Sequence, residues 1–169
     1  MEGADQLLTI AEIGATFAGF TAIVGLIANS ARGNLGAKLN FWLMIEFSFA
    51  TIVFALIPFT IFNFGVAPRQ IWTASSISIA VFLVLHVVFV RKHVTEAIAR
   101  SQFSVKSPLI VAPLFAATII IQVLNALGII FDRTYAAFFL GIFLFLLIAF
   151  ANFVLLLNQL WVAADEADS

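Results

Sequence analysis

The sequence predicts an all-α fold, in which a single domain over residues 1–169 forms a bundle of five transmembrane helices. Of its 169 residues, 63% are hydrophobic and only 10% are charged, whereas roughly 25% of the residues in an ordinary soluble domain carry a charge. The mean hydropathy is +1.15, so most of the molecular surface must face lipid. The apolar residues also fall into five runs of about 20 residues, the length that a helix needs to cross a bilayer.

The first run, residues 7–28, is predicted to remain in the mature protein as a helix. A secretory signal peptide begins with basic residues. Here the apolar stretch instead follows the acidic residues Glu2 and Asp5, and Glu12 interrupts it. These acidic residues favour a retained transmembrane helix over a cleaved signal peptide.

Amphipathic aromatic residues mark the ends of three of the other four runs, as they do in transmembrane helices. An amphipathic ring prefers the headgroup level, and the three tryptophans and the one tyrosine all fall near the end of a run: Trp42, Trp72, Trp161 and Tyr135. Pro58 and Pro113 lie inside the second and fourth runs, where each frees a backbone carbonyl and favours a kink. These four predicted helices cover residues 41–62, 71–90, 109–131 and 135–161.

The basic residues predict which side of the membrane each connection faces, because short loops rich in Lys and Arg stay in the cytoplasm. Six of the eight lie in the first and third connections: Arg32, Lys38, Arg91, Lys92, Arg100 and Lys106. Only Arg69 and Arg133 lie in the second and fourth. The N-terminus is therefore predicted outside and the C-terminus in the cytoplasm. We expect the protein in the plasma (inner) membrane of a bacterium.

Small residues form one stripe along the first predicted helix. They recur at spacings of four and three residues: Ala11, Ala15, Ala18, Ala22 and Gly25. At about 100° per residue, the bulky side chains of the same run lie on the opposite side of the helix. Because close packing drives helix association inside a membrane, the small stripe is predicted to be a helix–helix contact, either within the chain or between two copies of it.

Three ionisable residues lie within the predicted spans, and they indicate two polar layers. Each such residue costs roughly 2.5–3.5 kcal/mol at the centre of a transmembrane helix, so each is a candidate functional group. Amides at similar depths complete the layers. The predicted outer layer holds Glu12, Gln122 and Asn125, and the predicted inner layer holds Glu46, His86 and Asn152.

The leading functional prediction is a small oligomeric membrane protein that conducts or translocates a proton or another small cation along these six residues. Carboxylates would bind or relay the ion, and amides would line its path. A single five-helix bundle rarely encloses a pore, so this function requires a homo-oligomer. In the alternative prediction, the same groups hydrogen-bond between helices, and the protein is a non-catalytic accessory subunit of a larger respiratory or photosynthetic membrane complex.

Other classes of function find no support in the sequence. There is no cysteine, and no motif of hydrolytic, phosphate-binding or zinc enzymes is present, so we expect neither catalysis nor a metal. The net charge of −1 argues against nucleic acid as a partner, which leaves the lipid bilayer. No cofactor is expected. The one alternative is a haem or chlorophyll-type pigment that takes His86 as its axial ligand.

Overall fold

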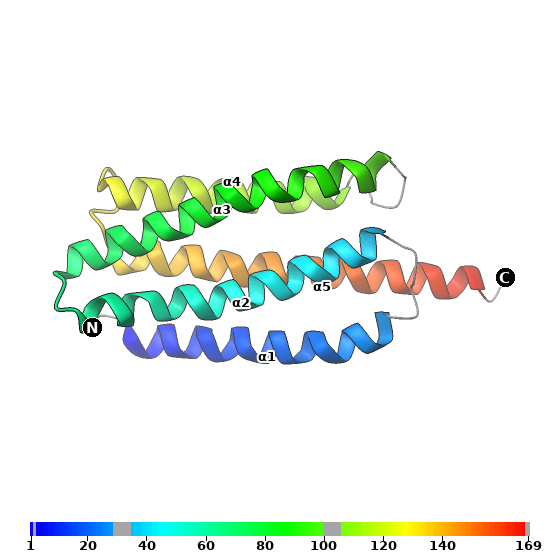
Figure 1. Cartoon of the computed structure of the whole chain (residues 1–169), viewed down its shortest axis with the longest axis horizontal. Helices are drawn as coiled ribbons and strands as arrows, with labels where there is room; N and C mark the ends of the chain where they lie inside the picture. Colours follow the sequence, from blue (N-terminus) through cyan, green and yellow to red (C-terminus); the bar gives the residue numbers. More distant parts are fainter. Residues whose placement is uncertain (2, 29–34, 100–105, 168–169) are drawn as a thin grey trace.

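The computed structural model is an elongated bundle of five helices that run roughly along one axis (Figure 1). It describes residues 1, 3–28, 35–99 and 106–167, and for Ala22 and some residues beside the gaps it describes the backbone only. The helices are α1 (Ala4–Ala28), α2 (Leu35–Asn63), α3 (Pro68–Ala99), α4 (Lys106–Leu127) and α5 (Tyr135–Ala167). The prediction of an all-α fold is confirmed.

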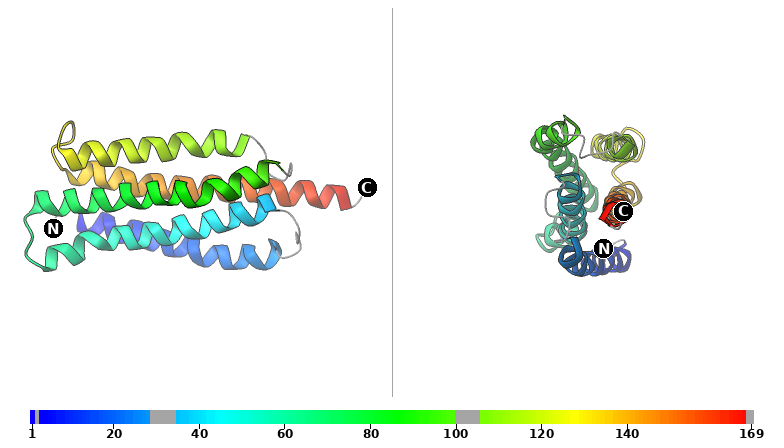
Figure 2. Two further views of the ribbon diagram at one scale, coloured as in Figure 1. Left: turned by 45° about the horizontal axis from the view of Figure 1, so that its top comes forward. Right: turned by 90° about the vertical axis from the view of Figure 1, so that its right-hand side faces the viewer.

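The helices α2 and α5 form the centre of the bundle. They pack against each other, α1 packs mainly against α2 at one edge, and the pair of α3 and α4 closes the opposite edge (Figures 1 and 2). The N-terminus and the turns α2–α3 and α4–α5 lie at one end of the bundle, and the C-terminus lies at the other. As an edge helix, α1 turns one long face away from the other four helices.

Four helices in the described part of the chain are long and apolar enough to cross a membrane. They are Ala4–Gly25, Gly36–Asn63, Pro68–Glu96 and Tyr135–Gln159, and the apolar part of α4, Val111–Leu127, is shorter. Large apolar side chains cover the outside of the bundle, and those of Phe64, Phe89 and Trp161 are more than two-thirds exposed. Because an apolar surface of this extent calls for lipid, the bundle is that of an α-helical membrane protein.

The centre of the bundle is an aromatic cluster of Phe47, Phe54, Phe82, Phe115 and Phe145. Phe47 is fully buried, and its ring centroid lies 5.1 Å from that of Phe115 and 5.4 Å from that of Phe145. Both ring pairs meet edge to face, a preferred geometry of aromatic pairs. Phe54 contacts Phe82 and Phe145. The aromatic cluster therefore joins α2, α3, α4 and α5.

The helix α4 ends at Leu127, before residue 131, where hydropathy predicts its end. Gly128 has a φ angle of 70°, which glycine adopts without steric cost. The Ile129 N–H donates a hydrogen bond of 3.2 Å to the Leu124 carbonyl. This pattern is a Schellman cap, and it stops the helix although the residues that follow it are apolar.

Three other helices are longer than their apolar runs. α2 begins at Leu35, α3 continues to Ala99 through part of the predicted third connection, and α5 continues to Ala167. Hydropathy reports only the part of a helix that lies in hydrocarbon, whereas intrahelical hydrogen bonds can continue beyond it. The predicted boundaries are therefore too short at these ends.

The face of α1 that packs on α2 is centred on Gly14. A Cβ atom on Gly14 would lie 3.1 Å from the Ser48 carbonyl oxygen and 3.2 Å from the Thr51 Cβ atom. Leu7 and Ile10 are buried on the same side of α1. Glycine therefore permits the close approach of two backbones that stabilises helix pairs in membranes.

The predicted small stripe of α1 coincides with this packing face only in part. Ala11 is buried and Ala18 is half-buried, but Ala15 is exposed, and the side chain of Ala22 lies outside the described part. Gly25 lies against the ring of Phe41, whose Cζ atom would be 2.7 Å from an added Cβ. The contact with α2 is thus rotated around α1 relative to the prediction, because Gly14 rather than Ala15 is the point of closest approach.

Candidate functional site

The outward face of α1 carries a continuous row of polar and small residues. Asp5, Thr9, Glu12, Thr16 and Gly19 are all exposed. Alternating spacings of four and three residues place them on one side of the helix, and we call them the α1 polar row. This row lies opposite the face that packs on α2.

Glu12 lies at the middle of the α1 polar row, beside open space. Thr9 donates a hydrogen bond of 2.9 Å to the Asp5 carbonyl, and Thr16 donates one of 2.9 Å to the Glu12 carbonyl. Their hydroxyl oxygens keep lone pairs for other donors, and a Cβ atom on Gly19 would meet nothing within 4 Å. An ionisable side chain that faces lipid at mid-membrane costs several kcal/mol, so this face of α1 calls for a polar neighbour.

Glu46 of α2 and His86 of α3 form a hydrogen-bonded pair between two helices. The Glu46 Oε1 atom lies 2.7 Å from the His86 Nδ1 atom. The His86 side chain is 3% exposed and that of Glu46 is 25% exposed. Phe115 stacks on the His86 ring at 5.3 Å between centroids, and Phe47 meets it edge to face at 5.1 Å. The imidazole is therefore held in place, while the carboxyl group stays accessible.

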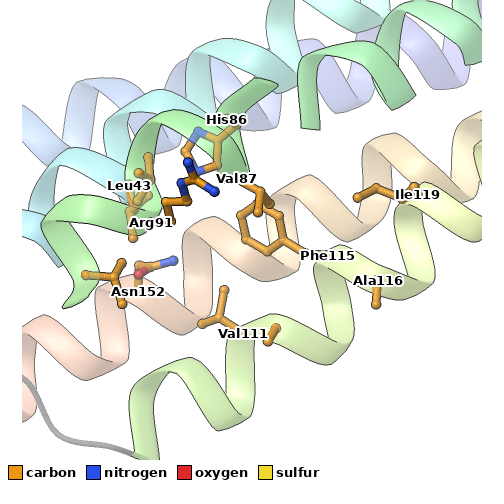
Figure 3. Close-up of a pocket in the computed structure, with 12 residues that line it drawn as sticks. Leu43, His86, Val87, Arg91, Val111, Phe115, Ala116, Ile119 and Asn152 are labelled. Atoms are coloured by element: carbon orange, nitrogen blue, oxygen red, sulfur yellow. The ribbon is translucent and has the colours of Figure 1, made fainter. Parts of the chain in front are cut away.

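His86 lies between two cavities. The smaller one has a volume of about 390 Å³ and is lined mainly by α3 and α4. Figure 3 shows His86, Arg91 and Asn152 at one end of it, and the apolar side chains of Ala116 and Ile119 at the other. The larger cavity, of about 740 Å³, runs along α2 and α3 and contains both members of the Glu46–His86 pair. We call the larger cavity the α2–α3 cleft.

Asn125 of α4 holds the turn between α4 and α5. Its Oδ1 atom accepts a hydrogen bond of 2.9 Å from the Thr134 N–H. Its Nδ2 group donates to the Thr134 carbonyl at 3.1 Å and to the Ser76 hydroxyl of α3 at 2.9 Å. Asn125 is fully buried, so these bonds satisfy an amide that would otherwise destabilise the fold.

Gln122 of α4 also bonds to α5. Its Nε2 group donates a hydrogen bond of 2.9 Å to the Ala137 carbonyl, and its side chain lies against Gly141. The structure therefore does not bring the predicted outer layer together, since Gln122 and Asn125 are buried and Glu12 faces outward from α1. The two amides connect helices.

The structure does bring together most of the predicted inner layer. Glu46 and His86 are in direct contact. Asn152 lines the smaller cavity together with His86, although its Nδ2 group donates to the Ile148 carbonyl of its own helix at 2.8 Å. The aromatic cluster separates this region from the amides of α4, because Phe82 lies between Ser76 and His86 along α3.

Sequence reasoning missed two features. The first is the α1 polar row, to which Asp5 and Thr9 belong. The prediction for this helix considered only the face that carries the alanine stripe. Asn40 of α2 is fully buried, and neither of its amide atoms has a hydrogen-bond partner, at a cost of about 1–3 kcal/mol. The position of Asn40 directly before the apolar run that starts at residue 41 could have indicated a buried amide. Asn40 was instead predicted to lie in a loop.

The described residues contain no group of three His, Cys, Asp or Glu side chains that could hold a metal ion. A pigment at His86 would have to bind the Nε2 atom, because Nδ1 faces Glu46. The haem or chlorophyll alternative stays a prediction.

No model of a known protein family, no curated protein and no solved structure matches the chain. The class of the protein therefore follows from the fold. It is an all-helical membrane bundle with four long apolar helices. Among the described residues, the α1 polar row and the Glu46–His86 pair are polar features that lie apart from each other and have accessible carboxyl groups.

Proposed function

We propose that the protein is a homo-oligomer that conducts a proton or another small cation across the membrane, with the α1 polar row lining the path. The exposure of Glu12 within the membrane-spanning part of α1, in one row with Asp5 and Thr16, carries this proposal. A carboxyl group at that depth needs a polar environment. Several copies of α1 around a common axis provide it, because their polar rows then face one another. All five helices then cross the plasma membrane of a bacterium, with the N-terminus outside and the C-terminus in the cytoplasm.

The order of residues along the α1 polar row suits a cation path. Rings of acidic side chains attract cations, and rings of apolar side chains act as gates. Asp5 forms an outer acidic ring, and Glu12 forms a second one about 10 Å deeper at 1.5 Å per residue. Ile23, which is 57% exposed, continues the row toward the cytoplasm. Ile23 supplies an apolar ring. The outer part of the path therefore attracts cations, and the apolar ring near the cytoplasmic end can act as the gate.

The interior of a single bundle offers no comparable path in its described part. The aromatic cluster fills the centre, where Phe47 and Phe145 are fully buried. Asn125 on one side of it is occupied by structural hydrogen bonds with Ser76 and Thr134, and on the other side Glu46 and His86 bond to each other. A path between copies requires none of these groups to move, and this favours an oligomer with α1 at its axis.

Cysteine cross-linking tests the proposed arrangement, because the chain has no cysteine of its own. A Gly19→Cys variant places a thiol in the α1 polar row, where the structure leaves room for it. We expect a short bifunctional thiol reagent to link copies of this variant in native membranes. A Val84→Cys variant, exposed on α3 at the far edge of the bundle, is expected to stay monomeric under the same treatment. A Gly19→Cys variant that forms no linked copies would contradict the proposal.

A second candidate function is an accessory subunit of a larger membrane complex. The charge of the α1 polar row favours it, because Asp5 and Glu12 are both acidic and the row contains no base. A basic side chain on a different subunit would complement such a row. In the same experiment, this function predicts that Gly19→Cys links to another protein instead of a second copy.

A further inference from the structure

The α2–α3 cleft opens toward the surroundings of the bundle. Its volume of about 740 Å³ lies within the range of roughly 300–1,000 Å³ that small-molecule sites occupy. Three of its lining residues, Trp42, Leu85 and Phe89, are at least half exposed. In a membrane these side chains face lipid. A ligand of the cleft therefore enters from the bilayer and must itself be soluble in lipid.

The walls of the α2–α3 cleft suit a flat ring. Trp42, Phe82 and Phe89 supply aromatic surface on both helices, and aromatic side chains pack favourably against planar π systems. Phe82 is tied to the aromatic cluster through Phe54, at 5.2 Å between centroids. One wall is thus part of the rigid core, whereas Trp42 and Phe89 are free to adjust to a ligand.

The polar groups of the cleft suit a neutral hydrogen-bond acceptor. Glu46 and His86 lie 2.7 Å apart and bond to each other, so the donors that the cleft offers to a carbonyl oxygen are Lys38 and His93. An anionic headgroup would meet the Glu46 carboxyl at the same place, so a neutral carbonyl fits better than a phosphate.

We infer that the α2–α3 cleft binds a quinone, a lipid-soluble molecule with a planar ring and carbonyl acceptors. The ring lies between the aromatic walls, a carbonyl oxygen accepts a hydrogen bond from Lys38 or His93, and the apolar tail extends into the bilayer. This site is separate from the α1 polar row, and the inference does not depend on ion conduction.

Fluorescence of Trp42 tests the inference, because quinones quench tryptophan on contact. The Trp72→Phe/Trp161→Phe double variant leaves Trp42 as the only tryptophan of the chain. This variant, in nanodiscs of phosphatidylcholine, is titrated with a short-chain ubiquinone. We expect saturable quenching. In the same background, the Lys38→Met/His93→Leu double variant, which removes both donors, and Phe89→Ala are each expected to weaken binding by about tenfold, which corresponds to the loss of one good contact.

The control is Phe64→Ala, since Phe64 is 81% exposed and lies at the α2–α3 turn, at the other end of the bundle. It is expected to bind the quinone like the parent. Quenching that rises without saturation, or that saturates equally in the Lys38→Met/His93→Leu and Phe89→Ala variants, would overturn the inference. So would loss of quenching when phosphatidylglycerol is added to the nanodiscs, because the occupant would then be an anionic lipid. Failure of ion flux would leave this result unaffected.

Discussion

A Glu12→Gln variant is expected to conduct cations at least about tenfold more slowly than the wild type, which corresponds to a barrier higher by about 1.4 kcal/mol. Glutamine keeps the size and hydrogen-bonding groups of the side chain but removes its charge and its exchangeable proton. If Glu12 forms an acidic ring on the path, each copy loses its charge, and the attraction for a cation falls accordingly. The measurement is potassium and proton flux into liposomes that contain equal amounts of each protein.

Two further carboxylates serve as controls for the Glu12 result. Glu96 lies near the end of α3, and a Glu96→Gln variant makes the same chemical change away from the α1 polar row. Glu46→Gln changes the α2–α3 cleft. Both are expected to conduct like the wild type, provided that all variants assemble equally in the same detergent. If Glu46→Gln abolishes flux and Glu12→Gln does not, the path runs along α2 and α3 and the proposed arrangement is wrong.

A Phe47→Ala variant is expected to show the largest loss of stability, about 3 kcal/mol. Phe47 is fully buried and contacts Phe82, Phe115, Phe145 and the His86 ring. Because lipid is as apolar as this core, the cost comes mainly from the cavity and the lost ring contacts. Reversible unfolding by increasing mole fractions of sodium dodecyl sulfate in mixed micelles measures the free energy of unfolding.

The matched control for Phe47→Ala is Phe49→Ala in the same helix. Phe49 is 56% exposed and lies on the outer side of α2. Its loss is expected to change the free energy of unfolding by less than about 0.5 kcal/mol, as at other surface positions. Similar losses at both positions would mean that the aromatic cluster does not organise the bundle.

Depth in the membrane could be predicted from the sequence, because each residue of a helix adds a fixed rise of about 1.5 Å. Glu46 and His86 were expected at one depth, and they are in direct contact. Glu12, Gln122 and Asn125 were also expected at one depth. They lie on different sides of the bundle, because depth says nothing about which helices are neighbours or how each is rotated.

The rotation of α1 shows why faces are harder to predict than spans. Its alanine stripe and the face that holds Leu7, Ile10 and Gly14 can both pack on a neighbouring helix, so periodicity alone gives two candidates for the packing face. The side chains and backbone of α2 decide between them, since a Cβ atom at Gly14 would lie only 3.1 Å from the Ser48 carbonyl oxygen and 3.2 Å from the Thr51 Cβ atom. With that face inward, Glu12 is turned outward. The position of the candidate path therefore depends on the contact between α1 and α2, which cannot be predicted from the sequence of α1 alone.

Chemical modification of a Thr16→Cys variant tests most directly whether the α1 polar row lines a water-filled path. The variant is reconstituted in liposomes and treated with a membrane-impermeant, positively charged thiol reagent while cation flux is recorded. The proposed function predicts that the reagent reacts and that flux falls close to that of empty liposomes, whereas Val84→Cys is unaffected. A thiol at position 16 that reacts only with a lipid-soluble maleimide, with flux unchanged by the charged reagent, would contradict it.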